Sequence, residues 1–429
     1  MIQIISQSQV PEASNSSLID KGGLRIQITD TNNQPISNAT VLLSYTGAPE
    51  STLEELKTDQ DGMTELISLP TPPLEYSLEK SNSIQPYSEY SIICNANGYS
   101  SFDLSGIQIL PETDSTQNIR LKPTFQNSSS NSIISPHTLY GNFPPKIAED
   151  EIKPTNDSGE IVLEKVVIPE YIIVHNGTPA DSSAQNYYIP YTDYIKNVAS
   201  SEIYATWPEA ALYANILAIM SFTLNRVFTE WYRGKGYSFT ITSSTAFDQK
   251  WTKDRNIFDR ISTVVDDIFT NYLSRPNVLQ PILTQYCDGK SVTCPNWMSQ
   301  WGSKELADEG YTASEILRYY YGDSIYINSA SQVEGIPASF PGFDLDIGSS
   351  GNEVLQMQNQ LNRIAKVYTN IPTIPADGIY GEKTKEAILA FQKIFGLPVT
   401  GIVNRRTWYK ISQIYVGITK IAEDPYSGY

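Results

Sequence analysis

Histidine and cysteine are scarce in this chain of 429 residues, which contains two histidines and three cysteines. Cys287 and Cys294 form the one closely spaced cysteine pair, and neither His137 nor His175 is near them in the sequence. Structural zinc sites usually have shorter cysteine spacing and two further ligands. The sequence therefore favours free thiols or a local disulfide over zinc at this pair, and predicts no metal and no cofactor.

The chain also has few positively charged residues and no long apolar run. The formal net charge is −17 at pH 7 and no basic tract offsets it, so nucleic acid and anionic membranes are not expected as partners. The longest nearly apolar run, 210–222, is shorter than the roughly 20 residues that cross a bilayer. It predicts a buried helix and no membrane span. Residues 1–9 lack a basic stretch and a continuous apolar stretch, so no ordinary secretory signal is expected.

Composition divides the first half of the chain into parts. Residues 1–20 are polar and aperiodic, which predicts a disordered N-terminal pre-segment. In 21–124, apolar residues alternate between turns rich in Asn, Asp, Gly and Pro, a pattern that indicates an all-β sandwich. Through Asn38-Ala39 and Thr58-Asp59 this part resembles carboxypeptidase regulatory-like sandwiches, a likeness of fold that says nothing of function.

Residues 125–165 are rich in Ser, Asn and Pro and then acidic, which is the composition of a linker. An exposed linker between folded domains is a natural site for a protease. The alternative is a plain spacer. Residues 329–343 are expected to form a second linker, and 419–429 a C-terminal tail.

One carboxylate stands out in 166–328, where mixed strand and helix patterns predict an α+β domain. A short helical pattern, 193–198, places Glu202 near a helix C-terminus, where the helix dipole disfavours an anion. A carboxyl that keeps its proton suits general-acid cleavage of a glycosidic bond, and the alternative is an exposed surface glutamate. Glu209 has a structural explanation, because Thr206 and Glu209 are spaced as a capping box at a helix start.

The surroundings of Glu202 resemble a known catalytic motif. Residues 197–222, NVASSEIYATWPEAALYANILAIMSF, are similar to the pattern V-A-S-E-x-x-x-x-W/F-P-x-E-A-L-x-A-Q of stage II sporulation protein D-like lytic transglycosylases. A second block, 298–322, resembles the M-S-Q-W-G…I-L-x-Y-Y-x-G tail of that family. The chain departs from the family at Asn215, where Gln is usual, and at Met220, where Arg is usual.

The resemblance implies which residues form the site. Glu202 would be the catalytic acid. Five further residues would contact the substrate, with the aspartate as the best second carboxylate: Ser201, Asp248, Gln249, Gln300 and Trp301. Tryptophans stack on sugar rings in many glycan grooves, although large aromatic side chains more often fill a core.

The last part, 344–418, closely resembles a peptidoglycan-binding domain of three helices. Its matching residues include Asp377-Gly378, Phe391-Gln392 and Thr407-Trp408, which are mostly structural and do not locate a ligand groove. The predicted fold is therefore multidomain, with an N-terminal all-β sandwich, a central α+β catalytic domain and a C-terminal three-helix domain.

The order of these parts resembles the pro-form of the spore cortex-lytic enzymes of clostridia. The resemblance implies a zymogen located in the spore cortex, whose substrate is cortex peptidoglycan. A subtilisin-like germination protease would cut it near Glu164 to Ile168, and it would then act as a lytic transglycosylase. Two alternatives stay open: a non-catalytic wall-binding protein, and an amidase that cuts the muramoyl–L-alanine bond. Zinc amidases need histidine and carboxylate ligands, which a chain with two histidines hardly supplies.

Overall fold

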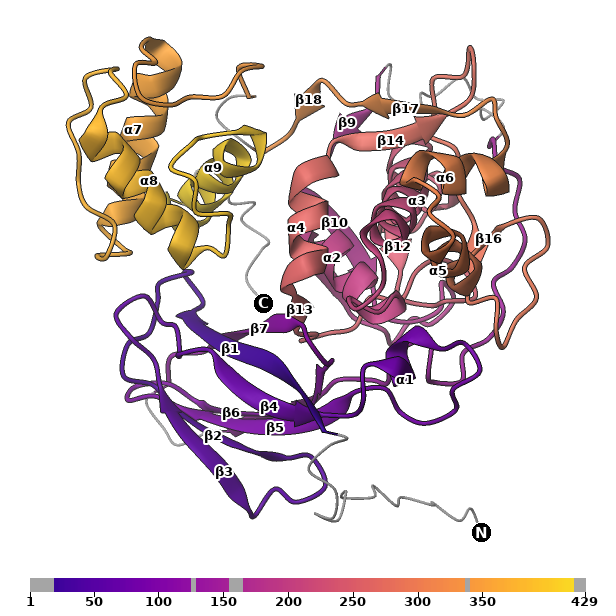
Figure 1. Cartoon of the computed structure of the whole chain (residues 1–429), viewed down its shortest axis with the longest axis horizontal. Coiled ribbons are helices and arrows are strands. Elements are labelled where there is room, and N and C mark those ends of the chain that lie inside the picture. Colours follow the sequence, from indigo (N-terminus) through magenta and orange to yellow (C-terminus); the bar gives the residue numbers. More distant parts are fainter. Residues whose placement is uncertain (1–18, 125–128, 154–164, 336–339, 420–429) are drawn as a thin grey trace.

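The computed structural model describes residues 19–124, 129–153, 165–335 and 340–419. It has three parts: β-strands at the N-terminus lie below a central part of helices and short strands and below a C-terminal group of helices (Figure 1). The chain is therefore multidomain, with mixed α and β structure. Most of the predicted pre-segment lies outside the described residues, and Asp20 already begins the first strand.

Two sheets form the N-terminal part and share one core. The strand order is β13-β7-β1-β4 in one sheet and β3-β2-β5-β6-β8 in the other. Alternate residues of β1, from Leu24 to Ile28, are buried in the same cluster as Val41 and Ile92 of the second sheet. The alternation in the sequence thus gives each sheet one apolar face, as a sandwich requires. The elements are β1 (Asp20–Asp30), β2 (Thr40–Tyr45), β3 (Thr52–Lys57), β4 (Ile67–Thr71), α1 (Glu75–Leu78), β5 (Ser88–Asn95), β6 (Ser101–Ile109), β7 (Asp114–Leu121) and β8 (Ser129–Ile133).

Strand pairing joins the sandwich to the central part. β13 (Ile257–Phe258) comes from the central part and pairs antiparallel with β7. Just before it, Asn256 donates from Nδ2 to the Gln108 carbonyl oxygen at 2.7 Å and accepts from the Gln108 backbone amide at 3.2 Å. Both residues are buried. The sandwich is therefore joined to the central part by buried contacts and is not a loosely tethered neighbour.

The predicted linker 125–165 is not a plain spacer over the residues that the structure describes. β8 adds in parallel to β6, and residues 134–153 continue along the central part, where His137 and Lys153 are buried. Local composition misses this arrangement because it carries no information on tertiary contacts.

The predicted cleavage region is only partly described. Val166 is buried, and Val167 and Ile168 form the buried strand β9, which pairs in parallel with β18 (Gln332–Val333). Burial and pairing hide these bonds from a protease, so cleavage between Val166 and Ile168 does not fit the folded chain. Glu164 and the residues from 154 to 163 lie outside the described residues.

The central part is built around α3 (Glu209–Phe228), which is buried along nearly its whole length. By length and composition α3 could cross a membrane, but 89% of its apolar window is buried inside the protein, as in a core helix. Around it lie β9 (Val167–Ile168), β10 (Tyr171–His175), β11 (Asn186–Pro190), α2 (Tyr191–Glu202), η1 (Arg233–Lys235), β12 (Ile241–Thr242), α4 (Asp259–Ile268), β14 (Asn271–Ser274), β15 (Tyr286–Cys287), β16 (Met298–Ser299), α5 (Gln300–Asp308), α6 (Ala313–Tyr321) and β17 (Tyr326–Ser329).

The turn before α3 is fixed by tertiary contacts, and the capping box predicted at Thr206 and Glu209 is wrong. α3 begins without a side-chain cap, and Thr206 Oγ1 has no hydrogen-bond partner within the described part of the chain. Instead the Trp207 indole is buried and donates from Nε1 to the Ser77 carbonyl oxygen at 3.0 Å. A buried tryptophan outweighs a cap that is worth roughly 1 kcal/mol.

Three helices form the C-terminal part, as the sequence predicts: α7 (Asn352–Ala365), α8 (Glu382–Ile394) and α9 (Arg405–Thr419). Gly378, with φ of 73°, makes a turn before α8, and the Gln358 side chain holds this turn by accepting from the Gly378 amide at 2.8 Å. α9 docks on α4, where Arg406 pairs with Asp267. The predicted tail begins at the last residue of α9, and 420–429 lie outside the described residues.

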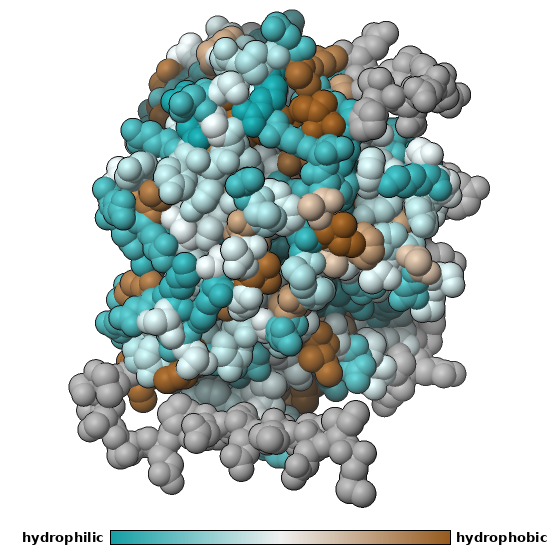
Figure 2. Space-filling view, turned by 90° about the vertical axis from the view of Figure 1, so that its right-hand side faces the viewer, coloured by the Kyte–Doolittle hydropathy of each residue, from teal (hydrophilic) through white to brown (hydrophobic). Residues whose placement is uncertain are grey.

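Figure 2 shows the face of the molecule that lies at the right of Figure 1. On this face apolar residues are scattered among hydrophilic ones, without an extended apolar area in the coloured part of the chain. Scattered apolar residues of this kind are ordinary for a protein surface and mark no binding site.

We expect Asn256→Ala to lower the free energy of unfolding by about 1–3 kcal/mol, because it leaves the buried Gln108 backbone groups without partners. Urea unfolding followed by tryptophan fluorescence measures the change. Asn118→Ala, in the exposed row of neighbouring β7, is the control. Equal stability of the two variants would contradict the role given to the Asn256–Gln108 contact.

Candidate active site

Glu202 is the last residue of α2, so it lies at a helix C-terminus as the sequence predicts. Its exposed fraction is only 3%, which excludes the alternative of a surface glutamate. Oε1 accepts a hydrogen bond from the Lys250 backbone amide at 2.6 Å. Oε2 has no hydrogen-bond partner of good geometry among the described residues.

Burial raises the pKa of Glu202 above the usual value for a glutamate. The Lys146 charge, the Lys250 backbone amide and the Tyr286 phenol oppose that rise in part. The direction agrees with the expectation from the sequence, but the main cause is loss of solvent and not the helix dipole. A carboxyl group in this setting holds its proton more tightly than an exposed one.

The Gln249 side-chain amide is the centre of a buried hydrogen-bond network that includes Tyr286, a neighbour of Glu202. Oε1 accepts from Tyr194 Oη at 3.1 Å and from Thr223 Oγ1 at 2.8 Å. Nε2 donates to Tyr286 Oη and to the Ile219 carbonyl oxygen, both at 3.1 Å. All four hydrogen bonds of the amide are thus made inside the protein. In this state Gln249 positions the Tyr286 phenol and has no free group for a substrate.

Asp248 is buried as well, and its carboxylate is fully engaged. Oδ1 accepts from Arg226 Nε at 2.7 Å. Oδ2 accepts from Tyr232 Oη at 2.7 Å and from the backbone amide and hydroxyl of Thr242 at 2.9 Å and 2.7 Å. Asp248 therefore acts as a structural anchor between α3 and the loop that follows β12, and it is not placed to share the chemistry of Glu202.

The other predicted substrate contacts are also buried. Ser201 Oγ donates to Thr252 Oγ1 and accepts from Arg255 Nε. Gln300 begins α5 and is buried. Trp301 packs against Trp207, with ring centres 5.0 Å apart, in the core and not in a groove. Their roles as substrate contacts stay predictions.

The two departures from the family motif both lie in the packed interior. Asn215 donates from Nδ2 to Ser303 Oγ at 2.7 Å and so ties α3 to α5. Its Oδ1 is buried and has no hydrogen-bond partner among the described residues. Met220 is fully buried in the apolar core.

The cation whose charge acts most strongly on Glu202 comes from the predicted linker. The Lys146 ammonium lies 4.9 Å from the centre of the Phe222 ring and 5.1 Å from that of Tyr286. It also donates to the Asp248 carbonyl oxygen. The residue as a whole is half-buried, so its stem lies near the surface while its ammonium points inward. Burial lowers the pKa of Lys146, and the charges of Glu202 and Asp248 partly restore it.

Residues 143–153, here called the cover segment, are held by side-chain amides of the central part. Gln285 donates to the Ile147 carbonyl oxygen at 2.7 Å and accepts from the Glu149 amide at 2.9 Å. Gln280 makes the same pair of bonds with the two backbone groups of Lys153. Backbone groups of the cover segment are thus bound by side chains of the central part, in the way that a groove binds an extended peptide. The segment lies between the loop 242–250 and the residues that precede β15.

Two cavities flank this region. One, of about 270 Å³, is lined by Glu149 and Glu151 of the cover segment and by Trp297 and Tyr320 of the central part. This cavity borders the cover segment. Because Trp297 lines the cavity and Trp301 lies in the core, Trp297 is the better candidate for an aromatic groove residue.

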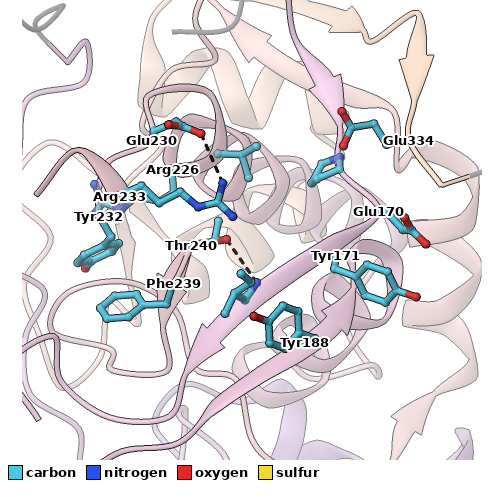
Figure 3. A pocket seen from close by; sticks show the side chains of 13 residues that line it. Glu170, Tyr171, Tyr188, Arg226, Glu230, Tyr232, Arg233, Phe239, Thr240 and Glu334 are labelled. Atoms are coloured by element: carbon cyan, nitrogen blue, oxygen red, sulfur yellow. Dashed lines mark hydrogen bonds and ion pairs between the residues drawn. The ribbon is translucent and has the colours of Figure 1, made fainter. Parts of the chain in front are cut away.

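The larger cavity, of about 400 Å³, lies on the outer face of the sheet β11-β10-β12 (Figure 3). Tyr171, Tyr188 and Phe239 form its aromatic side, and Glu230 and Arg233 lie across from them. Arg226 and Tyr232 belong both to this wall and to the partners of Asp248. The Asp248 cluster therefore separates this cavity from the inner side, and Glu202 does not line it.

Cys287 and Cys294 form a disulfide, with Cα atoms 5.7 Å apart, and Cys94 is a buried free thiol. A disulfide was one of the two states that the sequence favoured. The bond closes the loop between β15 and β16, next to Trp297. In the part of the chain that the structure describes, no group of three His, Cys, Asp or Glu side chains is arranged to hold a metal ion.

Sequence reasoning missed Lys146, Tyr286 and the Arg226–Asp248 pair. Lys146 follows Pro144-Pro145, and consecutive prolines favour an extended backbone without donors of its own. That local signal was compatible with a segment bound in a groove. Tyr286 and Arg226 carry no local signal, because their roles depend on neighbours that are distant in sequence.

Comparison with known proteins identifies the C-terminal part. Residues 350–411 match the family model of a peptidoglycan binding domain. The chain carries a peptidoglycan-binding domain. It is also 31% identical over 105 residues to a spore cortex-lytic enzyme of Bacillus cereus, a match that covers 24% of this chain and 36% of the relative. The chain thus spans about a third of the length of the curated relatives it matches.

Two solved structures add to this comparison. The N-terminal domain of SleB is 30% identical and is covered over 99% of its length by 18% of this chain, with a TM-score of 0.16. The Bacillus anthracis TIE protein is 13% identical, with 24% of this chain and 17% of that chain covered and a TM-score of 0.17. TM-scores this low support no statement on the fold.

We expect Glu202→Gln to change how stability depends on pH. Because the folded-state pKa of Glu202 is raised, the folded chain binds a proton more readily than the unfolded chain, and stability falls as pH rises through that pKa. Glutamine cannot ionise, so the stability of Glu202→Gln relative to wild type should increase as the pH rises above about 4, the usual pKa of a glutamate in the unfolded chain. Urea unfolding at each pH gives the difference. Glu209→Gln, which removes an exposed carboxylate at the start of α3, is the matched control, and parallel profiles for wild type and Glu202→Gln would count against a raised pKa.

Proposed function

We propose that this protein is a spore cortex-lytic enzyme of the lytic transglycosylase type that is made as a zymogen. The observation that carries the proposal is Glu202, a buried carboxyl with a raised pKa that lies under a peptide segment which proteolysis could release. The peptidoglycan-binding domain supports cortex peptidoglycan as the substrate. Similarity to a spore cortex-lytic enzyme supports wall-lytic activity and a location at the spore cortex.

In the proposed reaction, the Glu202 carboxyl gives its proton to the glycosidic oxygen that follows N-acetylmuramic acid, and the bond from C1 to this oxygen breaks. Positive charge develops at C1 and the ring oxygen. The Glu202 carboxylate then takes the proton of the muramoyl 6-hydroxyl, whose oxygen bonds to C1 and closes a 1,6-anhydro ring. No water is consumed, and Glu202 recovers the proton that it gave.

The number of carboxyl groups available in the predicted site favours transglycosylation over hydrolysis. Hydrolytic glycosidases use two carboxyl groups, one as acid and one as base or nucleophile. Here Asp248 is fixed by Arg226 and three further donors. Glu202 is the remaining carboxyl group of the predicted site, and transglycosylation needs only one.

The uncut chain is unsuited to this reaction for two reasons. The cover segment fills the space next to Glu202, so a glycan has no access. In addition, the Lys146 charge lowers the pKa of Glu202 and so opposes the protonated form that must start the reaction. Proteolysis by a germination protease of the subtilisin type would remove both obstacles when the cover segment leaves.

The C-terminal domain has a separate role in the proposal. Its matched residues build a three-helix core around Leu361, Phe391 and Trp408, and none of its groups reaches Glu202 in the contacts of the described residues. It would hold the enzyme on the insoluble wall and raise the local concentration of glycan, without taking part in bond cleavage.

We expect Glu202→Gln to lower the rate of cortex cleavage by the processed protein by about two to four orders of magnitude, the usual contribution of a general acid and base. Mass spectrometry of digested cortex fragments measures the products, and the wild type should give 1,6-anhydro-muramic ends. Glu209→Gln should retain most of the turnover.

The same measurement separates the alternatives. Reducing ends would indicate a hydrolase, free peptides an amidase, and unchanged cortex a protein that only binds the wall. Production of anhydro ends by Glu202→Gln at the wild-type rate would remove Glu202 from the mechanism.

We expect the full-length chain to be nearly inactive until it is cut between Lys153 and Lys165. A recognition sequence for a specific protease, introduced into this interval, allows cutting under control, and release of soluble cortex fragments reports activity. The uncut chain and the intact wild type incubated with the same protease are the controls. If the uncut chain digests cortex as fast as the cut one, the protein is not a zymogen.

A further inference from the structure

The Lys146 ammonium lies among three electron-rich groups, so the place that it occupies is suited to bind a cation. Two are aromatic faces, Phe222 at 4.9 Å and Tyr286 at 5.1 Å from the ring centres, and the third is the Asp248 carbonyl oxygen. Aromatic faces and carbonyl oxygens attract cations. The groups belong to α3, to β15 and to the loop after β12, all parts of the central domain that remain when the cover segment leaves.

The charges around Lys146 also suit a cation. Glu202 and Asp248 both attract it, and Arg226 and Glu149 are the further charged groups that act on it. Glu149 leaves with the cover segment, and the Arg226 guanidinium is neutralised by its buried pair with Asp248. When Lys146 and Glu149 are gone, the pocket keeps the Glu202 carboxyl group, on which the Lys250 charge still acts, more weakly than that of Lys146.

Lys146 and Glu202 are close enough to interact but are not in direct contact. The ion pairs of the described residues include Arg226 with Asp248 and Arg226 with Glu149, but none between Lys146 and Glu202. The ammonium thus lies near the carboxyl group, and their charges interact without a direct ion pair. In a glycosidase reaction the anomeric centre lies in such a place, since the acid contacts the leaving oxygen and the positive charge develops one bond further away.

We propose that the slot occupied by Lys146 is a cation subsite, formed by Phe222, Tyr286 and the Asp248 carbonyl oxygen, which in the processed enzyme takes the positively charged sugar ring. The ligand class is a sugar ring with positive charge at C1 or the ring oxygen, or a protonated iminosugar that imitates it. This assignment rests on the proposed function for the identity of the sugar. In the uncut chain Lys146 acts as a tethered cationic occupant of the same subsite.

The first test uses the full-length chain. Lys146→Ala removes Cγ, Cδ, Cε and the ammonium and leaves a slot that n-propylammonium fits. We expect n-propylammonium to raise the melting temperature of Lys146→Ala by at least about 3 °C at a concentration well above its dissociation constant. Neutral 1-propanol at the same concentration should raise it much less.

Wild type, in which Lys146 still fills the slot, and Lys57→Ala, which removes an exposed lysine at the end of β3, are the controls for this test. n-Propylammonium should not stabilise either protein beyond the effect of 1-propanol. Equal effects of the amine and the alcohol on Lys146→Ala would overturn the cation subsite.

The second test uses the processed protein with its natural residues, so it does not depend on whether Lys146→Ala folds. We expect the protonated iminosugar 2-acetamido-1,2-dideoxynojirimycin to bind at least about tenfold more tightly than its neutral 1,5-lactam, as measured by calorimetry. Phe222→Leu should reduce this preference while Phe228→Leu, on the same helix, should not. Equal affinity of amine and lactam would overturn the proposal.

Neither test measures turnover, so the cation subsite and the transglycosylase function can be disproved independently. If the protein prefers the cation but produces no anhydro-muramic ends, the subsite is supported and the transglycosylase function is wrong. If it produces anhydro ends without any preference for the cation, the function is supported and the subsite is wrong.

Discussion

Charges at the contact between the cover segment and the central domain are the constraint on which the rest of this structure depends. Lys146, Glu149 and Lys153 of the cover segment meet Glu202, Arg226 and Asp248 of the central domain there. Removing one partner of a buried pair is far more costly than the pair itself is stabilising. The cluster therefore holds α3, the loop after β12 and the cover segment in one arrangement.

The same charges explain how loss of the cover segment would act on Glu202. The segment takes away Lys146, whose charge lowers the pKa of Glu202 more than that of Lys250, which stays. Arg226 and Asp248 stay paired. Loss of the Lys146 charge favours the protonated form of Glu202, which is the form that the proposed reaction needs.

The three parts of the chain are interlocked around this site. β13 extends a sheet of the sandwich, the Trp207 indole donates to Ser77 of the sandwich, and Arg406 of α9 pairs with Asp267 of α4. A single cut in the chain breaks none of these contacts. Release of the cover segment is therefore a separate step, for which the wall substrate would have to compete with the Gln280 and Gln285 clamps.

Much of the fold and one residue of the site could be predicted from the sequence. The helix end at Glu202 and the three C-terminal helices follow from local patterns that tertiary structure does not overrule. The capping box failed because burial of Trp207 fixed the turn instead, and the cover segment was taken for a linker because Ser, Asn and Pro describe composition and not contacts. Lys146 could be recognised as part of the site only when Phe222, Tyr286 and Asp248, from three distant stretches, were brought together.

A site with one working carboxyl group has a consequence for control. In an enzyme with two catalytic carboxylates, a single inserted cation would favour the ionised form of both, which suits the base and harms only the acid. In the proposed reaction the only carboxyl group must begin the cycle protonated, so the charge of one nearby lysine opposes the first step. An extended segment with one ammonium would then be enough to occupy the proposed sugar subsite and to lower the pKa of the proposed acid, without a bulky inhibitor domain.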